Sequence, residues 1–159
     1  MEAISFRPIR ADDEAFLYRV YASTRTAELA PVPWTDEQKT AFLKMQFTAQ
    51  HTHYQSEFPN AAFQVILRGA VPVGRLYVHR RTDEIGIVDI ALLPEHQRSG
   101  IGSAILRDIL DEGARTGMPV RIYVERFNPA LHLYERLGFR RCGDLSVYYH
   151  MEWLPPPTA

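Results

Sequence analysis

The sequence predicts an α/β protein (an α+β mixed sheet with accompanying helices) that forms one domain over residues 1–159. The chain has 159 residues, of which 46% are hydrophobic and 23% charged, a composition typical of a soluble globular domain. Before Ala61 the apolar residues recur at the spacing of a helix, and from Ala61 onward they alternate with polar residues as in a strand. A strand, a loop, a helix and another strand then follow over 84–125, which indicates a right-handed crossover between parallel strands.

The first part of the chain is expected to form one short strand and two helices. Residues 5–9 form the strand, and Pro8 confines it to a sheet edge or a strand end. A helix follows to about Thr26, because the acidic residues 12–14 complement its dipole. The Thr-x-x-Gln order at 35–38 is a capping box, which predicts a second helix from Thr35. The expected buried stripe of this second helix comprises Phe42, Met45 and Ala49.

The remaining part is expected to be mostly sheet. A hairpin turns at Gly69, and residues 84–93 are apolar on both faces, which indicates a central strand covered on two sides. A helix should follow Gly102 and end at Gly117. The other expected elements are a strand at 120–125, a short helix at 129–137, strands at 139–142 and 147–153, and a flexible tail at 155–159. The predicted order is therefore β-α-α-β-β-β-α-β-α-β-β.

Charge and composition exclude several classes of protein. Eighteen Lys and Arg against 19 Asp and Glu give a net charge of −1, which argues against a sequence-independent nucleic-acid binder and mildly against strongly charged ligands. The chain has no run of 18 apolar residues, and its N-terminus lacks the basic-then-apolar order of a signal peptide, so we expect no membrane partner. The lone Cys142 cannot form an internal disulfide, and we expect a cytoplasmic protein.

A glycine-punctuated turn joins the central strand to the following helix. The first amides of a helix lack intrahelical partners and attract anions, and no acidic residue lies between Gln97 and Ser103. The candidate anion-binding residues are Gln97, Arg98, Ser99, Gly100, Ile101, Gly102 and Ser103. The alternative is that Gly100 and Gly102 serve only a tight turn. The motifs of P-loop and dinucleotide-binding proteins are not matched.

A second motif follows this turn. Gln97, Gly100 and Gly102 match the pattern Gln/Arg-x-x-Gly-x-Gly/Ala. Further on, the chain carries Asn128, Ala130, Leu133-Tyr134-Glu135 and Gly138-Phe139. Two such motifs in this order, with two helices after the first strand, resemble the GNAT superfamily of acetyl-CoA-dependent N-acetyltransferases. The resemblance spans nearly the whole chain and implies the GNAT, or acyl-CoA N-acyltransferase, fold.

The resemblance implies how acetyl-CoA would bind. In that family the pyrophosphate lies on the loop that corresponds to 97–103. The pantetheine arm lies between two splayed parallel strands, here 84–93 and 120–125, and pairs with main-chain groups of the first. That stretch comprises Ile90, Ala91 and Leu92. Asn128 matches a position that hydrogen-bonds the arm, and a cap for the helix that starts at Pro129 is an equal alternative.

Two residues are the catalytic candidates. Tyr134 matches the family's usual general acid, which protonates the departing thiolate, whereas a tyrosine at this spacing in isolation is more often a core aromatic. Asp89 is the leading general base, because a carboxylate in an apolar strand must be paired, solvated or functional. A structural ion pair is at least as good an explanation for Asp89. Glu84 and Glu125 are lesser candidates, and some family members use no single base.

The acceptor side is less defined. In the family, the amine is held by the segment between the first two helices, by the second helix and by a strand near the C-terminus. Here these segments point to Trp34, Met45 and Tyr149. Anchoring in the core is the blander explanation for such aromatics. His51 and His53 do not indicate a metal, because positions i and i+2 of a helix point to different faces. The acceptor is a small-molecule or peptide amine, and a homodimer is common among relatives.

The leading interpretation is therefore an enzyme that transfers acetyl from acetyl-CoA to a primary amine by direct attack. The alternative is a catalytically silent coenzyme A-binding module that acts in regulation or protein interaction. A redox or kinase domain would need motif residues that are missing. The identity of the acceptor is not readable, because specificity depends on loops added to the fold.

Overall fold

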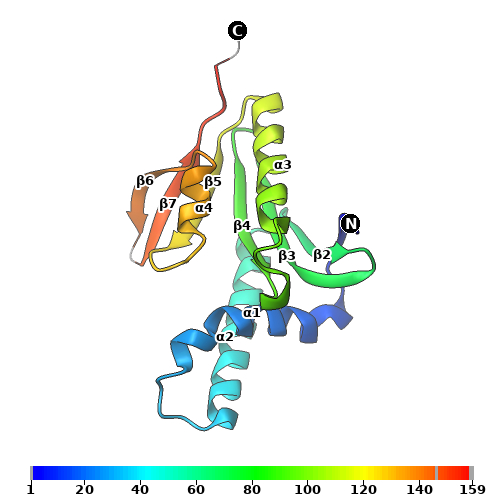
Figure 1. Ribbon diagram of the computed structural model, residues 1–159, viewed down its shortest axis with the longest axis vertical. Coiled ribbons are helices and arrows are strands. Elements are labelled where there is room, and N and C mark those ends of the chain that lie inside the picture. Colours follow the sequence, from blue (N-terminus) through cyan, green and yellow to red (C-terminus); the bar gives the residue numbers. More distant parts are fainter. Residues whose placement is uncertain (1, 146, 158–159) are drawn as a thin grey trace. The chain divides into compact units, whose positions relative to one another are not determined.

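The computed structural model describes residues 2–145 and 147–157 and confirms the predicted order of elements. Its strands form one mixed sheet in the order β1-β2-β3-β4-β5-β7-β6 (Figure 1). The strands are β1 (Ile4–Pro8), β2 (Ala62–Arg68), β3 (Val71–Arg80), β4 (Ile85–Leu92), β5 (Val120–Glu125), β6 (Arg140–Leu145) and β7 (Tyr148–Trp153). The helices are α1 (Glu14–Leu29), α2 (Asp36–Glu57), α3 (Ile101–Thr116) and α4 (Leu131–Arg136), with 3-10 turns η1 (Ala11–Asp13) and η2 (Pro94–His96).

The pairing of strands confirms a mixed sheet. β4 and β5 are parallel, whereas β1 with β2, β5 with β7 and β6 with β7 are antiparallel. β1 is an edge strand, as Pro8 predicts, and β4 is the central strand of the order. Pro155–Pro157 of the predicted tail belong to no helix or strand, and residues 158 and 159 lie outside the described residues.

Contacts between Cα atoms divide the chain into two units. Unit 1 comprises Met1–Leu76 and Ile90–Gln97, and unit 2 comprises Tyr77–Asp89 and Arg98–Ala159. β3 and β4 therefore each continue from one unit into the other. None of the helices in the described ranges combines the length and the apolar character that a bilayer span requires.

In unit 1, α1 and α2 pack against each other around an aromatic cluster. The buried residues of this cluster are Leu17, Tyr21, Leu43 and Phe47. The capping box is present, since Gln38 N donates to Thr35 Oγ1 at 3.1 Å and Thr35 N donates to Gln38 Oε1 at 2.9 Å. The predicted stripe of α2 is wrong: Met45 is 59% exposed and Ala49 is exposed. Apolar residues lie on several sides of α2, and packing against α1 selects the side of Leu43 and Phe47.

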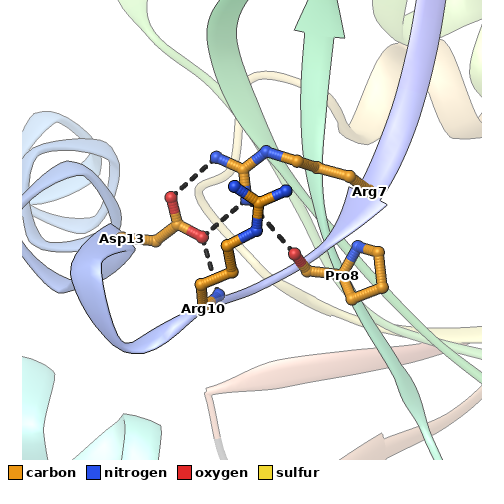
Figure 2. A network of polar contacts seen from close by, with 4 residues as sticks. All are labelled: Arg7, Pro8, Arg10 and Asp13. Carbon is orange, nitrogen blue, oxygen red and sulfur yellow. Dashed lines mark hydrogen bonds and ion pairs between the residues drawn. The ribbon is translucent and has the colours of Figure 1, made fainter.

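The start of unit 1 is held by a bidentate ion pair. Arg7 on β1 donates to both carboxylate oxygens of Asp13 at 2.8 Å, and the backbone N–H of Arg10 donates to Asp13 Oδ2 at 2.7 Å (Figure 2). Arg7 also donates to the carbonyl oxygen of Pro8 at 3.2 Å. The hydrogen bond from Arg7 is the main reason that the pKa of Asp13 lies below its usual range. This network connects the end of β1 to the start of α1.

In unit 2, α3 packs closely on the sheet. Its predicted apolar stripe is confirmed, with Ile105, Leu106, Ile109 and Leu110 all buried. A Cβ added to Gly113 would lie 2.8 Å from the Trp153 ring and 3.1 Å from Val120 Cγ2, so a glycine is required at this approach. Gly100 and Gly117 bound the helix, both in the left-handed conformation.

The β5–β7 pair in unit 2 has two different faces, because side chains alternate along strands. One face is apolar and buried, and it comprises Val120, Ile122, Val124 and Met151. The other we call the outer face, and it comprises Arg121, Tyr123, Glu125, Tyr148, His150 and Glu152. The register places Tyr123 opposite His150 and Glu125 opposite Tyr148. The outer face is thus aromatic and charged.

Candidate active site

The parallel strands β4 and β5 pair over only part of their lengths. The register joins Ile85–Ile87 to Val120–Ile122, and in the described residues it ends there, although β4 continues to Leu92 and β5 to Glu125. Main-chain groups along diverging strand edges can pair with an extended ligand. Asp89 lies two positions beyond the last paired residue of β4. The predicted splay of the two strands stays a prediction, and the end of their pairing in the described residues is what it requires.

The turn into α3 has the backbone that an anion site requires. Gly100 is the N-cap residue of α3 with φ of +86°, and a Cβ added there would meet nothing within 4 Å. Arg98 has φ of +60°, an uncommon conformation for a residue other than glycine. The first turn of α3 contains no acidic residue. The open space beside unpartnered helix amides fits a pyrophosphate.

The unit 1 end of β4 is positioned by two contacts. The Gln97 side chain donates to the carbonyl oxygen of Leu92 at 3.0 Å, which ties the turn to the strand end. A Cβ added to Gly74 on β3 would overlap the carbonyl oxygen of Ala91 and lie 3.1 Å from Leu92 Cα. The predicted cofactor stretch comprises the half-buried Ile90, Ala91 and Leu92. Sequence reasoning missed Gly74, and the available signal was a glycine inside a strand.

Unit 2 brings the two catalytic candidates together. Tyr134 on α4 is 4% exposed, and its ring contacts Phe139 edge-on with centroids 5.7 Å apart. Burial is the main cause that raises the pKa of Tyr134, and the charge of Asp89 raises it further. Asp89 follows Ile85 and Ile87 in alternation, so it shares their face of β4. The hydroxyl of Tyr134 is thus neutral and lies within the field of the Asp89 carboxylate.

Asn128 is observed to cap the turn before α4. Its Oδ1 accepts a hydrogen bond from Ala130 N at 2.8 Å. The two N–H donors of the Asn128 amide are not used by this cap. The two predicted roles are therefore compatible, because the oxygen serves the helix start and the nitrogen can serve a ligand.

The acceptor-side candidates are distributed over both units. In unit 1, Trp34 is 40% exposed, and Met45 lines a shallow depression of about 750 Å³ along α2. In unit 2, the ring of Tyr149 already contacts two guanidinium groups, with Arg141 Cζ at 4.1 Å and Arg126 Cζ at 4.8 Å from its centroid. This arrangement favours a structural role for the Tyr149 ring. Within the described residues, no group of three or more His, Cys, Asp or Glu side chains is placed to hold a metal.

Comparison with known proteins identifies the class. Residues 12–139 match the model of the Acetyltransferase (GNAT) family, so the chain belongs to that family. The resemblance inferred from the two motifs and the predicted fold class are thereby confirmed. The family uses acetyl-CoA, which also confirms the predicted cofactor.

Particular relatives share parts of the sequence. A [Ribosomal protein bS18]-alanine N-acetyltransferase of Escherichia coli K12 is 36% identical over 69 residues, which cover 42% of this chain and 47% of that protein. An N-alpha-acetyltransferase of Sulfurisphaera tokodaii is 33% identical over 40% of each chain. A streptothricin acetyltransferase of Streptomyces lavendulae is 36% identical over 40% of this chain and 34% of its own. The matches span less than half the length of these relatives.

Solved structures share the fold over the whole chain. The PaiA N-acetyltransferase of Thermoplasma acidophilum, solved in complex with coenzyme A, has a TM-score of 0.70 at 18% identity and covers 96% of this chain and 99% of its own. The ribosomal-protein-S18-alanine N-acetyltransferase of Escherichia coli has a TM-score of 0.62 at 18% identity, with coverage of 99% and 97%. At these identities the likeness shows the fold.

Proposed function

We propose that residues 1–159 form a single N-acetyltransferase domain that transfers acetyl from acetyl-CoA to a primary amine by direct attack. The observation that carries this proposal is the end of the β4–β5 pairing at Ile87 and Ile122, followed by the glycine-capped start of α3. The family match over 12–139 includes segments of both units, which supports one domain. We also propose a cytoplasmic location, consistent with the single cysteine.

The cofactor is proposed to lie along this strand end and turn. Main-chain groups of Ile90, Ala91 and Leu92 would pair with its extended arm, as an added strand pairs with a sheet edge. The amides at the start of α3 and the Arg98 side chain would hold the pyrophosphate, and the Asn128 amide would donate to the arm. The proposed pyrophosphate-binding residues are Gln97, Arg98, Ser99, Gly100, Ile101, Gly102 and Ser103. When bound, acetyl-CoA supplies the thioester that accepts the attack.

The proposed chemistry uses Asp89 and Tyr134 as a pair. The neutral amine nitrogen forms a bond to the thioester carbon, and Asp89 accepts the proton that this nitrogen loses. The carbon–sulfur bond breaks, and Tyr134 donates its hydroxyl proton to the departing sulfur. Asp89 then holds one proton too many and Tyr134 one too few, so transfer between them restores both groups.

The acceptors named for the relatives define a panel for the test. A ribosomal-protein alanine and streptothricin represent a peptide and a small molecule respectively. Contacts from Trp34, Met45 and Tyr149 to the acceptor stay a prediction, and so does a homodimer.

The experiment measures acetyl-CoA binding and thiol release separately. The melting temperature is recorded with millimolar acetyl-CoA, NADH and ATP. Binding at 100 times the dissociation constant stabilises the native state by about 2.7 kcal/mol. Thiol release is then followed with a peptide bearing N-terminal alanine and with small amines. Binding with release supports the enzyme, whereas binding without release from any amine identifies the silent coenzyme A-binding module. A melting temperature unchanged by acetyl-CoA would overturn both.

A further inference from the structure

The C-terminal end of α4 is a Schellman motif that includes Tyr134. The backbone N–H of Phe139 donates to the carbonyl oxygen of Tyr134 at 3.0 Å, and that of Gly138 donates to the carbonyl oxygen of Glu135 at 3.0 Å. Gly138 has φ of +103°, and this motif requires a positive φ after the helix. The apolar contact that often accompanies the motif is here the contact between the rings of Tyr134 and Phe139. Residues 137–139, which we call the α4 cap, therefore hold Tyr134 by its main chain and by its ring.

The side chain of Trp153, the last residue of β7, lies against the α4 cap. A Cβ added to Gly138 would lie 3.2 Å from Trp153 Cδ1 and 3.5 Å from Trp153 Nε1. The indole ring is therefore next to the main chain of Gly138, and no side chain separates the two. The glycine of the cap thus serves two purposes, because it adopts the positive φ and leaves room for this ring.

The Trp153 ring is held from another direction by α3. A Cβ added to Gly113 would lie 2.8 Å from Trp153 Cζ3, so the ring is also next to the main chain of that helix. Trp153 lies opposite Val120 in the β5–β7 register and two positions after Met151, so it shares the buried face of the pair with both. The ring thus lies between a glycine of α3 and the glycine of the α4 cap.

The position of α4 depends strongly on such contacts. The helix has only six residues, and a helix of this length gains little stability from its own hydrogen bonds. Tertiary packing at its cap therefore decides where it lies. Tyr134 is buried and is the third residue before the end of α4, so a displacement of the cap also displaces its ring.

From these observations we propose that Trp153 is a positioning residue for Tyr134 and acts through Gly138 and Phe139. The proposal rests on the proposed function, in which Tyr134 donates its hydroxyl proton to the departing sulfur. Proton transfer requires the donor within hydrogen-bond reach of the acceptor, and a displacement of about 1 Å can cost about 100-fold in rate. Trp153 has no part in the chemistry itself.

The kinetic test compares Trp153→Leu with the unmodified protein, using an amine that supports thiol release. Trp153→Leu should lower kcat by about 10- to 100-fold and leave KM for acetyl-CoA nearly unchanged, because the turn into α3 is retained. Trp153→Phe keeps a ring next to the α4 cap and should recover most of kcat. An unchanged kcat in Trp153→Leu would overturn the proposal and leave the acetyltransferase proposal standing.

A matched control separates positioning from a loss of stability. Ile66 on β2 is fully buried and belongs to unit 1, whereas Tyr134 and Trp153 belong to unit 2. Ile66→Ala also removes buried apolar atoms, so it should lower the melting temperature without lowering kcat well below that temperature. If Ile66→Ala lowers kcat as much as Trp153→Leu does, the effect is one of stability and the proposal is overturned.

A second variant displaces the Trp153 ring without changing it. The Cβ in Gly113→Ala would lie 2.8 Å from this ring, so the ring and α3 must move apart. We expect kcat to fall, and Trp153→Phe should restore part of it in the double variant, because the smaller ring leaves room for the methyl group. Asp108→Asn, a change at an exposed carboxylate on the same helix, is the control and should leave kcat unchanged. Losses in kcat that multiply in the double variant would contradict the proposal.

A spectroscopic readout separates the proposal from the proposed function. In protein labelled with 3-fluorotyrosine, the fluorine NMR signal of Tyr134 is the one that Tyr134→Phe removes. Trp153→Leu and Gly113→Ala should both shift this signal, whereas Ile66→Ala should leave it in place. If no amine supports thiol release, or if Tyr134→Phe retains kcat, the proposed function fails and the signal still decides whether Trp153 positions Tyr134. A signal that neither variant shifts would overturn that role.

Discussion

At the residue scale, the hydroxyl of Tyr134 keeps its proton because burial and the charge of Asp89 raise its pKa together. A proton donor with a raised pKa is neutral throughout the physiological range, so deprotonation of this group cannot limit activity near neutral pH. The Leu-Tyr-Glu motif singled out this residue, and its role as the general acid stays a prediction. Its coupling to Asp89 was not readable from sequence, because it depends on α4 and β4 meeting in three dimensions.

Substitution of the proposed proton-transfer pair should show strong non-additivity. Tyr134→Phe should lower kcat by about 10²–10⁴-fold while acetyl-CoA affinity stays nearly constant. Asp89→Asn should also lower kcat, and the double variant should be only slightly slower than the slower single variant, since both act on one proton path. Stopped-flow thiol release and calorimetric binding check this. If the fold-losses in kcat of the two single variants multiply in the double variant, the two residues act independently.

Protonation of Asp13 should weaken the ion pair at the start of the chain. Its pKa is lowered in the folded state, so the pair stabilises the protein above the unfolded carboxyl pKa of about 3.9, and this stabilisation is lost as pH falls through the lower folded value. At pH 7, Asp13→Asn should reduce the free energy of unfolding by about 1–3 kcal/mol. Urea denaturation from pH 7 to 2.5 should show the difference from the unmodified protein shrinking below pH 4, while Asp108→Asn shows no such trend.

At the element scale, the capping signals were good predictors and the amphipathic pattern of α2 was not. The capping box of Thr35 and Gln38 marks the start of α2, and Gly117 marks the end of α3. Both signals are local, so the sequence was sufficient to predict these helix ends. The buried side of α2 depended on α1, whose Leu17 and Tyr21 pack near Phe47. The close approach of Gly74 to Ala91 was likewise unpredictable, because it depends on how closely the main chains of β3 and β4 meet.

The two glycine caps of α3 provide a controlled test of the anion site. Gly100 and Gly117 have φ of +86° and +69°, and an added Cβ meets nothing within 4 Å at either position. Gly100→Ala and Gly117→Ala should therefore each lower the free energy of unfolding by a similar amount, about 1–2 kcal/mol. Only Gly100→Ala should weaken acetyl-CoA binding, measured by calorimetry. Equal affinity in the two variants would place the pyrophosphate elsewhere.

At the scale of the whole molecule, the order of elements was predicted correctly and the division into two units was not. The periodicity of apolar residues depends on local structure, and each helix or strand is a local segment of the chain, so the order of elements could be predicted. The units are discontinuous in sequence, with 77–89 separated from 98–159, so their composition depends on long-range contacts that one sequence does not display. The bounds of β5 agree with the prediction, and those of β1, β4 and β7 differ by no more than one residue. The predicted end of β6 at Cys142 is wrong, because the strand continues past the irregularity between Arg141 and Gly143 to Leu145.

Unfolding should be cooperative despite the two units. β3 and β4 each run from one unit into the other, so melting either unit breaks strands of both. We expect one calorimetric transition in which the calorimetric and van't Hoff enthalpies agree. Two resolved transitions would contradict the proposal of a single domain over residues 1–159.

The irregularity of β6 contains Cys142, a residue that can carry a spectroscopic label. The register shifts between Arg141 and Gly143, and the intervening Cys142 is exposed, with its Sγ 3.5 Å from the carbonyl oxygen of His150. It is the single cysteine of the chain, so a maleimide fluorophore would attach at one defined point without any engineered residue. Because partial desolvation and the charge of Glu152 raise the pKa of this thiol, conjugation should be run above neutral pH. The dye would then report, by its emission, on changes in the surroundings of the β6–β7 pair.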